Sequence, residues 1–435
     1  VYHVHELVFH AAATVNEFEK KADFAIARDN YAIDSVPQFA PGSAIDPAHV
    51  MILTGMRPDG RLDWTSPPGH WVVLRMGYSL TGAENHPATV EATGLEVDKL
   101  DASAVRDYIR HYLDIYKSVT GPALFGAHGL EALTVDSTEI GAQNWTPDML
   151  ADFQRLRGYD PRPWLPALTG AVVRSPTDSD KFLWDFRRTI AQLLATNHYG
   201  VIGEVARAEG LVNYGEALED RRPSFGDDME MRQHASIPMG AMWTYVSHPA
   251  ATYIADLRGA ASVTHIYGQN LTAAESLTSA GQPWAYAPRS LKPIIDLEFA
   301  LGVNRVVIHT SVHQPVDRPP GLSLFQYGQF FNRLESWADA AGPWITYIAR
   351  CSYLLQQGRA SADIAYFYGE EAPITGLFGD KRQSDIPPGY GFDFVDADAL
   401  AHRLSVDHGD LVTASGMRYR LLYLGGNSSR MTLAV

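Results

Sequence analysis

Acidic side chains follow several short apolar runs in this sequence, at positions where acids are able to carry out hydrolysis. Asp136 and Glu139 come directly after the apolar run 132–135, Glu216 follows a second run, and Glu275 follows a weaker third one. Where strands alternate with helices, the carboxyl ends of parallel strands meet at one edge of the sheet, and catalytic groups lie there. We therefore expect these acids to converge on one site, with Glu216 in contact with the substrate.

Two carboxyl groups that face each other across a cleft suit the hydrolysis of a glycosidic bond. A protonated carboxyl gives its proton to the departing oxygen, while an ionised one attacks the sugar or activates water. The chain has no P-loop and no dinucleotide-binding motif that would favour another chemistry. Any single acid after a strand is as readily a helix N-cap or a solvated loop residue, so the prediction depends on the convergence of several acids.

Five further residues are candidates for contacts with a substrate. Asp98 and Lys99 lie in the loop after the first predicted strand, and His309 and His313 follow the last strand predicted for the same sheet. Trp284 offers an aromatic face of the kind that packs against the apolar face of a sugar, although large cores use aromatic residues as well. The two histidines suit hydrogen bonds to sugar hydroxyls, because their spacing on a loop does not force both rings onto one metal ion.

Alternating strands and helices predict the architecture that positions these residues. Continuous apolar runs indicate strands buried on both faces of a parallel sheet, and periodic segments indicate the helices between them. Strands are predicted at 71–76, 132–135, 211–214, 270–274 and 305–308, and helices at 102–118, 147–157, 180–209, 253–267, 291–301 and 344–355. This alternation favours a (β/α)₈ barrel over residues 71–358, preceded by a lead-in segment at 1–70.

A second α/β domain is expected from residue 359 onward. Apolar runs at 362–367 and 419–424 flank a further periodic segment at 395–404, which restarts the alternation after a boundary near 358–361. The chain begins with Val1 and ends in an apparent strand, so we expect that this domain is truncated and that the chain is a piece of a longer protein. Within the predicted barrel, Asp227 and Asp228 follow a Pro- and Gly-containing stretch, so we expect them in a surface turn.

Composition excludes several classes of protein. The chain has 435 residues, with 35 Lys and Arg against 50 Asp and Glu, so its net charge of −15 argues against nucleic acid as a partner. Cys351 is the single cysteine, which excludes an internal disulfide and a cysteine-based zinc site. No apolar run reaches the roughly 18 residues that a membrane-spanning helix needs.

Several short blocks occur along the chain in a distinctive order and spacing. The blocks are NEFEKKA at 16–22, GHWVVLRMG at 69–77, GLEVDKL at 94–100, DSTE at 136–139, RGYD at 157–160, WDFRRT at 184–189, AAES at 273–276, HTSVHQP at 309–315 and YIARC at 347–351. Their order and spacing resemble the α-L-rhamnosidases of glycoside hydrolase family 106 over nearly the whole chain. The resemblance implies a (β/α)₈ catalytic barrel, an inverting mechanism, removal of terminal α-L-rhamnose from a glycoside, oligosaccharide or polysaccharide, a calcium ion near the sugar hydroxyls, and a periplasmic or secreted location.

The same resemblance assigns roles to individual residues. Glu139 matches the general acid of the family, Glu275 matches its general base, and Asp136 matches the aspartate that accompanies the acid. One departure concerns the stretch PMGAMW at 238–243, where Ala241 stands in place of an expected glutamate. An acid there would line the site or bind the cation, so we expect weak or absent calcium unless Asp136 or Glu216 rebuilds the metal site.

Two other functions remain compatible with the sequence. A retaining barrel glycosidase that acts on another sugar would use the same kind of carboxyl pair. A catalytically impaired sugar-binding relative would explain Ala241.

Overall fold

The computed structural model describes residues 2–4, 42–86, 88–139, 143–217, 226–324, 327–370, 386–426, 428 and 431–435. Much of the predicted lead-in segment therefore lies outside the described residues. The described chain divides into two compact units. The first unit contains the residues up to Val105 and those from 143 to Leu193, and the second contains Arg106–Glu139, the stretch from Leu194 to 217 and everything from Gly226 onward.

The first unit is organised around two helices and a small sheet. Strand β1 (Tyr2–Val4) pairs with β2 (Tyr78–Leu80) in antiparallel fashion. Helix α3 (Met149–Arg157) packs against α4 (Pro176–Leu193) through buried aromatic rings, among them Phe153 and Phe182. The helices predicted at 147–157 and from 180 onward are confirmed.

The strand predicted at 71–76 is wrong. These residues have no strand conformation, and all their apolar side chains except that of Met76 are exposed, with Val72 at 85% of its full accessibility. An apolar run alone does not fix a strand, because a strand also needs a neighbour that accepts its backbone hydrogen bonds. Within the described residues, this segment pairs with no other strand.

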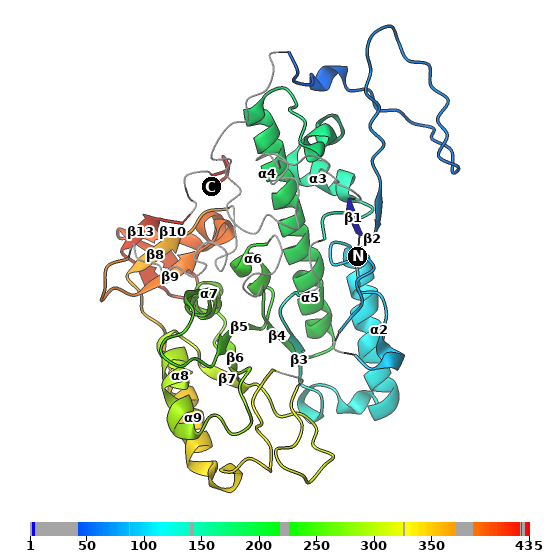
Figure 1. Cartoon of the computed structure of the whole chain (residues 1–435). Helices are drawn as coiled ribbons and strands as arrows, with labels where there is room; N and C mark the ends of the chain where they lie inside the picture. The colour runs from blue at the N-terminus through cyan, green and yellow to red at the C-terminus, as the bar shows by residue number, and fades with distance from the viewer. Residues whose placement is uncertain are drawn as a thin grey trace. The chain divides into compact units, whose positions relative to one another are not determined.

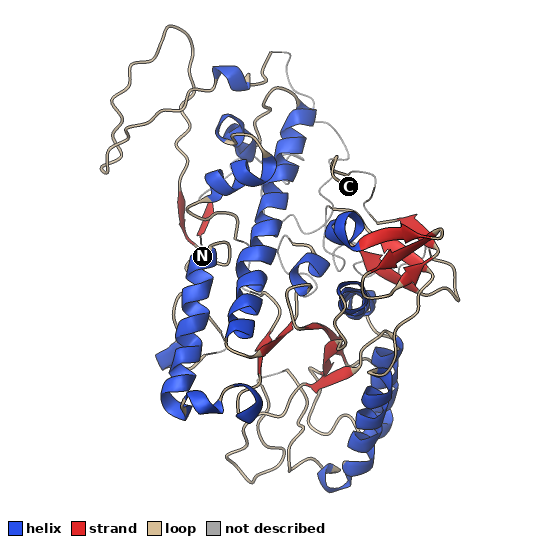
Figure 2. Cartoon of the chain, turned by 180° about the vertical axis from the view of Figure 1, so that it is seen from behind, coloured by secondary structure: helices blue, strands red, loops and turns tan. Residues whose placement is uncertain are grey.

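The second unit contains a curled parallel sheet of five strands in sequential order (Figures 1 and 2). The strands are β3 (Ala132–Val135), β4 (Val212–Gly215), β5 (Ile237–Trp243), β6 (Ala273–Thr278) and β7 (Arg305–Ile308). The sequence missed β5, because its Pro and Gly residues are poor strand formers. The predicted α/β fold is confirmed, and the five strands form half of a barrel. A complete (β/α)₈ barrel stays a prediction.

Helices follow the strands of this sheet as predicted. The long segment from 194 continues as a π-helical turn (Leu194–Gly200) and α5 (Val201–Ala208). The remaining helices are α2 (Ala102–Thr120), α6 (Asp228–Arg232), α7 (Ala251–Tyr267), α8 (Pro288–Ala300) and α9 (Gly342–Leu355). Apolar side chains of α7, α8 and α9 pack with those of β5 and β6 into one buried core that includes Met242, Leu257 and Ile295.

A second sheet lies against the other side of α7. Its strands β8 (Ile364–Phe367), β9 (Phe392–Val395) and β13 (Leu421–Leu424) are parallel, in the order β13-β8-β9. After a π-helical turn (Ala399–Arg403), the strands β10 (Leu404–Asp407), β11 (Asp410–Thr413) and β12 (Arg418–Tyr419) form a separate antiparallel sheet in that order. Helix α7 is therefore buried on two opposite sides, which explains its many small residues.

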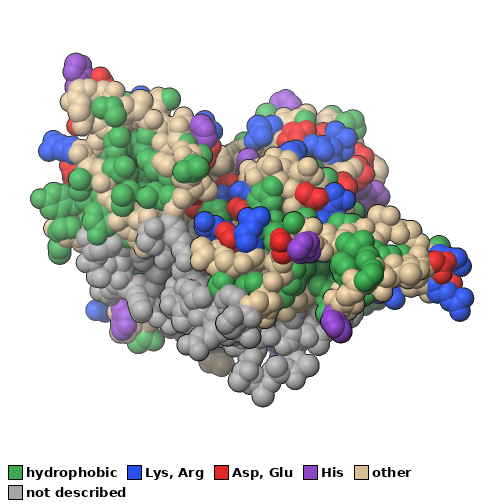
Figure 3. Space-filling model, turned by 90° about the horizontal axis from the view of Figure 1, so that it is seen from above, with side chains coloured by type: hydrophobic (Ala, Val, Ile, Leu, Met, Phe, Trp, Pro, Cys, Tyr) green, Lys and Arg blue, Asp and Glu red, His purple; other side chains and the backbone are tan. Residues whose placement is uncertain are grey.

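Charge on the surface and the hydropathy of the helices bear on the partners of the protein. On the face drawn in Figure 3, Lys and Arg side chains lie next to Asp and Glu side chains rather than in one basic field. Among the helices that the structure describes, none is long and apolar enough to cross a membrane.

Candidate active site

Three of the predicted acids meet at the carboxyl end of the five-stranded sheet. Asp136 directly follows β3, Glu216 directly follows β4, and Glu275 lies in the middle of β6. Each offers a carboxylate oxygen, and these oxygens all lie within 4.8 Å of one another. The sequence correctly places these acids together, and the roles it assigns to them stay predictions.

The alternation of side chains along the strands explains why these acids share one face. Ile237, Met239 and Ala273 form a small apolar cluster with Tyr214 and Val307 from the neighbouring strands. Residues two positions further along a strand point to the same face. Glu216 follows Tyr214 at this spacing, and Glu275 follows Ala273, so both carboxyls extend the face that the apolar cluster fills.

Glu275 is held by a hydrogen-bond relay. The Thr278 hydroxyl donates to Oε1 of Glu275, and His309 Nδ1 lies 3.2 Å from the Thr278 hydroxyl oxygen and 3.9 Å from the Glu275 carboxylate. Because the Thr278 hydroxyl donates its one proton to Glu275, its oxygen acts as the acceptor toward His309, and Nδ1 of His309 is the donor. Burial raises the pKa of Glu275, His309 and Thr278 oppose that shift, and the charges of Asp136 and Glu139 add to it.

Glu216 is the most buried of the three acids. Its Oε1 has no hydrogen-bond partner within the described residues. Burial raises the pKa of Glu216 well above its ordinary value, the charges of Glu275 and Asp136 raise it further, and the Arg232 guanidinium opposes the shift. A buried carboxyl group with an unsatisfied oxygen and like-charged neighbours binds either a proton or a cation.

Glu139 lies outside this tight group but close enough to act on it electrostatically. The side chain is exposed, its carboxylate accepts a 3.2 Å hydrogen bond from the Ser137 hydroxyl, and its charge contributes to the raised pKa of Glu275. The Ser137 amide donates to Asp136 at 2.8 Å. One short turn thus orients both acids that follow β3.

A residue that the sequence did not single out fixes this turn to β4. The Tyr199 hydroxyl donates to the Ala217 carbonyl oxygen at 2.8 Å and accepts from the Thr138 hydroxyl at 2.7 Å. The Thr138 amide donates to the same carbonyl at 3.2 Å. Because Ala217 follows Glu216 directly, these bonds fix the positions of the acids after β3 and β4 relative to each other.

Ala241 lies beside Glu275 in the strand pairing. The two residues are register partners on β5 and β6, and Ala241 is buried. Paired residues of neighbouring strands point to the same face, so Ala241 presents a methyl group where a longer acid would reach toward the cluster. Each carboxylate in the cluster is a hard oxygen ligand of the kind that calcium prefers. The donor set with its unpartnered Glu216 oxygen therefore fits such a cation, and Ala241 adds no ligand.

The group of three acids does not include the remaining predicted residues. Trp284 is 48% exposed in the loop after β6, with a φ of 60° that is strained for a bulky side chain, and such strain is common near ligand sites. His313 is exposed in the loop after β7. Asp98 and Lys99 belong to the first unit. Asp98 accepts from Gln143, Thr146 and Leu100, and Lys99 pairs with Glu96 at 3.0 Å.

The expectation that Asp227 and Asp228 form a surface turn is wrong, because both are buried. Asp227 is the N-cap of α6 and accepts from the amides of Met229 and Glu230 at 2.9 and 3.0 Å. The Tyr368 hydroxyl donates to the same carboxylate. The Asp–Asp sequence before an apolar segment is itself a capping signal, which the Pro- and Gly-containing stretch before it obscured.

Comparison with known proteins identifies the family of the chain. The α-L-rhamnosidase profile of glycoside hydrolase family 106 matches residues 1–435. The chain belongs to this family of α-L-rhamnosidases. A solved rhamnosidase from Novosphingobium sp. PP1Y superimposes with a TM-score of 0.90 at 56% identity, covering 98% of this chain and 41% of the other. A curated protein of Formosa agariphila, provisionally named a β-glucuronidase, is 36% identical over 388 residues, or 88% of this chain.

This chain spans only part of its relatives, namely 41% of the solved rhamnosidase and 32% of the Formosa protein.

Proposed function

We propose that this protein is an inverting exo-α-L-rhamnosidase. The observation that carries the proposal is the convergence of Asp136, Glu216 and Glu275 at the carboxyl end of the sheet in a member of the rhamnosidase family. Rhamnose-terminated oligosaccharides, polysaccharides or glycosides are the proposed substrates, and a periplasmic or secreted location belongs to the same proposal.

In this mechanism Glu275 acts as the general base and Glu139 as the general acid. Glu275 takes a proton from a water molecule as the water oxygen bonds to the anomeric carbon, and Glu139 gives its proton to the glycosidic oxygen as the bond to that oxygen breaks. Thr278 and His309 favour the ionised form of Glu275, which a base requires. The exposure of Glu139 suits an acid that must reach the departing group.

The spacing of the acids supports this choice of pair. An inverting pair needs about 6.5–9.5 Å between its carboxyls to leave room for water. Asp136, Glu216 and Glu275 come closer to one another than this, within 4.8 Å. Glu139 stands outside that group on the same loop and is therefore the acid that suits a wider separation from Glu275.

Asp136 and Glu216 are the residues that would hold a calcium ion. Bound there, calcium would orient sugar hydroxyls and neutralise part of the negative charge of the cluster. Because Ala241 supplies no carboxylate, the cluster has one ligand fewer than the family resemblance implies, and we propose that calcium binds weakly to this chain.

A second candidate function is hydrolysis of a glucuronide, which the name of the Formosa relative suggests. A uronate substrate carries a carboxylate, and four acids would repel it unless a cation intervenes. The acids Asp136, Glu139, Glu216 and Glu275 therefore favour a neutral sugar such as rhamnose. Assay of the full-length protein with aryl α-L-rhamnoside and aryl β-D-glucuronide in parallel separates these candidates.

Proton NMR of the rhamnoside reaction tests the mechanism. Inversion releases β-L-rhamnose first, and mutarotation then produces the α anomer. Release of the α anomer first would instead establish a retaining enzyme. No turnover by the full-length protein, despite measurable binding of L-rhamnose, would support the impaired sugar-binding relative.

A further inference from the structure

A buried ion pair lies along the edge of strand β5 that faces β4, beyond the point where β4 stops pairing with it. Strand β4 pairs with β5 only at Ile237 and Pro238. Beyond Pro238, Arg232 at the end of α6 and Asp256 on α7 form an ion pair with each other, and both are buried.

This pair satisfies the backbone of β5 in place of β4. Arg232 Nε donates to the Met239 carbonyl oxygen at 2.8 Å, and Oδ2 of Asp256 accepts from the Ala241 amide at 2.8 Å. Met239 and Ala241 are two residues apart, so their groups lie on the same edge of the strand. A donor and an acceptor from side chains thus replace the donor and acceptor that a neighbouring strand would supply.

Gly240 shows how closely α7 approaches this edge. A Cβ atom at Gly240 would lie 2.7 Å from Oδ2 of Asp256, which is too close for a real contact, and 3.2 Å from the backbone carbon of Asp256, which is unusually tight. On the opposite edge of β5, Ala241 pairs with Glu275. Asp256 of α7 therefore contacts β5 at Ala241, the residue that pairs with the proposed base.

Electrostatics link the same pair to the acid cluster. Burial alone would lower the pKa of Arg232, but the charges of Asp256, Asp228 and Glu216 outweigh burial and raise it. Arg232 in turn opposes the raised pKa of Glu216. The guanidinium stays charged behind the cluster at all physiological pH values.

We propose that Arg232 and Asp256 are positioning residues for the acid cluster. They hold the part of β5 that β4 does not pair with, and this part of β5 pairs with Glu275 on β6. This inference rests on the proposed function for its activity readout. A planar guanidinium and a carboxylate suit the task, because together they offer several directed hydrogen bonds at fixed angles.

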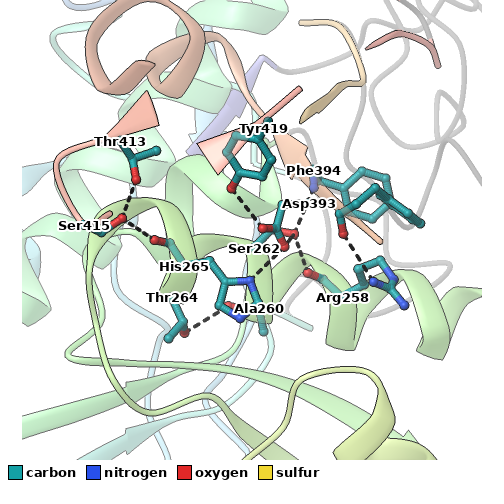
Figure 4. A network of polar contacts seen from close by, with 11 residues as sticks. Arg258, Ala260, Ser262, Thr264, His265, Asp393, Phe394, Thr413, Ser415 and Tyr419 are labelled. Atoms are coloured by element: carbon teal, nitrogen blue, oxygen red, sulfur yellow. Dashed lines mark hydrogen bonds and ion pairs between the residues drawn. The ribbon is translucent and has the colours of Figure 1, made fainter. Parts of the chain in front are cut away.

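The other side of α7 provides a matched control. Asp393 on β9 is buried and accepts from His265 Nδ1 at 2.8 Å and from the Tyr419 hydroxyl at 2.9 Å, while the Phe394 amide donates to Ser262 at 2.9 Å (Figure 4). This network also joins α7 to a parallel strand through a buried carboxylate. It differs in joining α7 to the second sheet instead of to β5.

The experiment compares Asp256→Ala with Asp393→Ala in the full-length protein. Both variants should have a lower melting temperature, so assays are run well below the lower one. For Asp256→Ala we expect kcat on aryl α-L-rhamnoside to fall on the order of 10²-fold, because a displacement of about 1 Å costs this much. We expect Asp393→Ala to keep kcat within twofold.

Hydrogen exchange gives a readout that does not depend on activity. Mass spectrometry of a peptide covering Ile237–Trp243 should show faster deuterium uptake in Asp256→Ala and unchanged uptake in Asp393→Ala. If Asp256→Ala does not fold, Asp256→Asn replaces it, since its amide oxygen still accepts from Ala241, and a loss of roughly tenfold is expected.

Equal fractional losses of kcat in the two variants would overturn the proposal, since they would reflect general destabilisation. Unchanged uptake at β5 in Asp256→Ala would overturn it as well. If the unaltered protein does not hydrolyse the rhamnoside, the proposed function fails, and the uptake comparison still decides whether the pair holds β5.

Discussion

Two buried acidic sites in the second unit differ in what surrounds the carboxylate. Asp393 accepts from His265 and Tyr419, and although burial alone would raise its pKa, these partners and Arg258 hold the pKa below its ordinary value. Glu216 has an oxygen without a hydrogen-bond partner within the described residues, and its pKa is raised well above the ordinary value.

This difference separates a structural acid from a functional one. A buried carboxylate with donors on its oxygens stabilises the ionised form and joins two elements, as Asp393 joins α7 and β9. Carboxyls that crowd together without enough donors cost stability, and folded proteins retain them where a ligand or a reaction supplies the missing partner. We propose that the acids that follow β3 and β4 and the acid within β6 are of this second kind.

Substitution of the proposed base should have the largest effect. Glu275→Gln keeps the size of the side chain but removes the proton acceptor, so we expect kcat to fall by about 10²- to 10⁴-fold on every rhamnoside. Steady-state kinetics with one aryl and one alkyl rhamnoside measure this. Asp393→Asn serves as the control, and a loss in the control as large as in Glu275→Gln would remove the distinction between the two sites.

Substitution of the proposed acid should discriminate between substrates. Glu139→Gln cannot protonate the departing oxygen, which matters for alkyl and sugar leaving groups and little for activated aryl groups. We expect losses of about 10²-fold or more on the former and few-fold changes on the latter. Equal losses on both kinds of substrate would contradict the assignment of Glu139 as proton donor.

Adding a carboxylate at Ala241 should bring the cluster closer to a calcium site. Ala241→Glu places an oxygen ligand beside Glu275, and affinity for calcium depends on the number of charged ligands. We expect affinity to rise on the order of tenfold or more, with sensitivity to chelators. Calorimetric titration measures this change, and our interpretation of Ala241 fails if the unaltered protein already binds calcium tightly and the variant binds it no better.

The smallest effect is expected at Glu298, a buried acid on α8. Its Oε2 accepts from the Ser276 hydroxyl at 2.7 Å, and burial raises its pKa well above the ordinary value. The folded state thus holds this proton more tightly than the unfolded state, so the free energy of unfolding falls as pH rises from the unfolded pKa toward the folded one. Each unit of pKa difference contributes about 1.4 kcal/mol.

Glu298→Gln should therefore make stability less dependent on pH above about 4.3, the unperturbed pKa of glutamate. Denaturant unfolding at several pH values checks this against the unaltered protein, with kcat expected to stay within a few-fold. A parallel pH dependence in both proteins would show that Glu298 is ionised in the folded state.

The sequence predicted the parts of the fold whose signals are local. The run at 305–308 and the periodic helices on either side of it gave β7, α8 and α9, and the acids after 132–135 and 211–214 meet as expected. Strand β5 escaped detection because its partners, rather than its residue types, make it a strand. For the same reason the exposed run at 71–76 was mistaken for one.

The pair behind β5 was also beyond the reach of the sequence. Arg232 and Asp256 are 24 residues apart and belong to two different helices, so no local pattern joins them. In the segment of β6, the residue types single out Glu275 and not Thr278. Its role depends on the pairing of β7 with β6, which brings His309 next to Thr278.

A crystal structure of the protein with L-rhamnose bound tests the central claim most directly, because it shows which carboxyls face the anomeric carbon. We expect this carbon to lie between Glu139 and Glu275, with the two carboxyl groups about 6.5–9.5 Å apart and Asp136 and Glu216 near the sugar hydroxyls. Rhamnose bound away from these acids would contradict the account, and a separation near 5 Å between the two carboxyls would contradict its inverting mechanism.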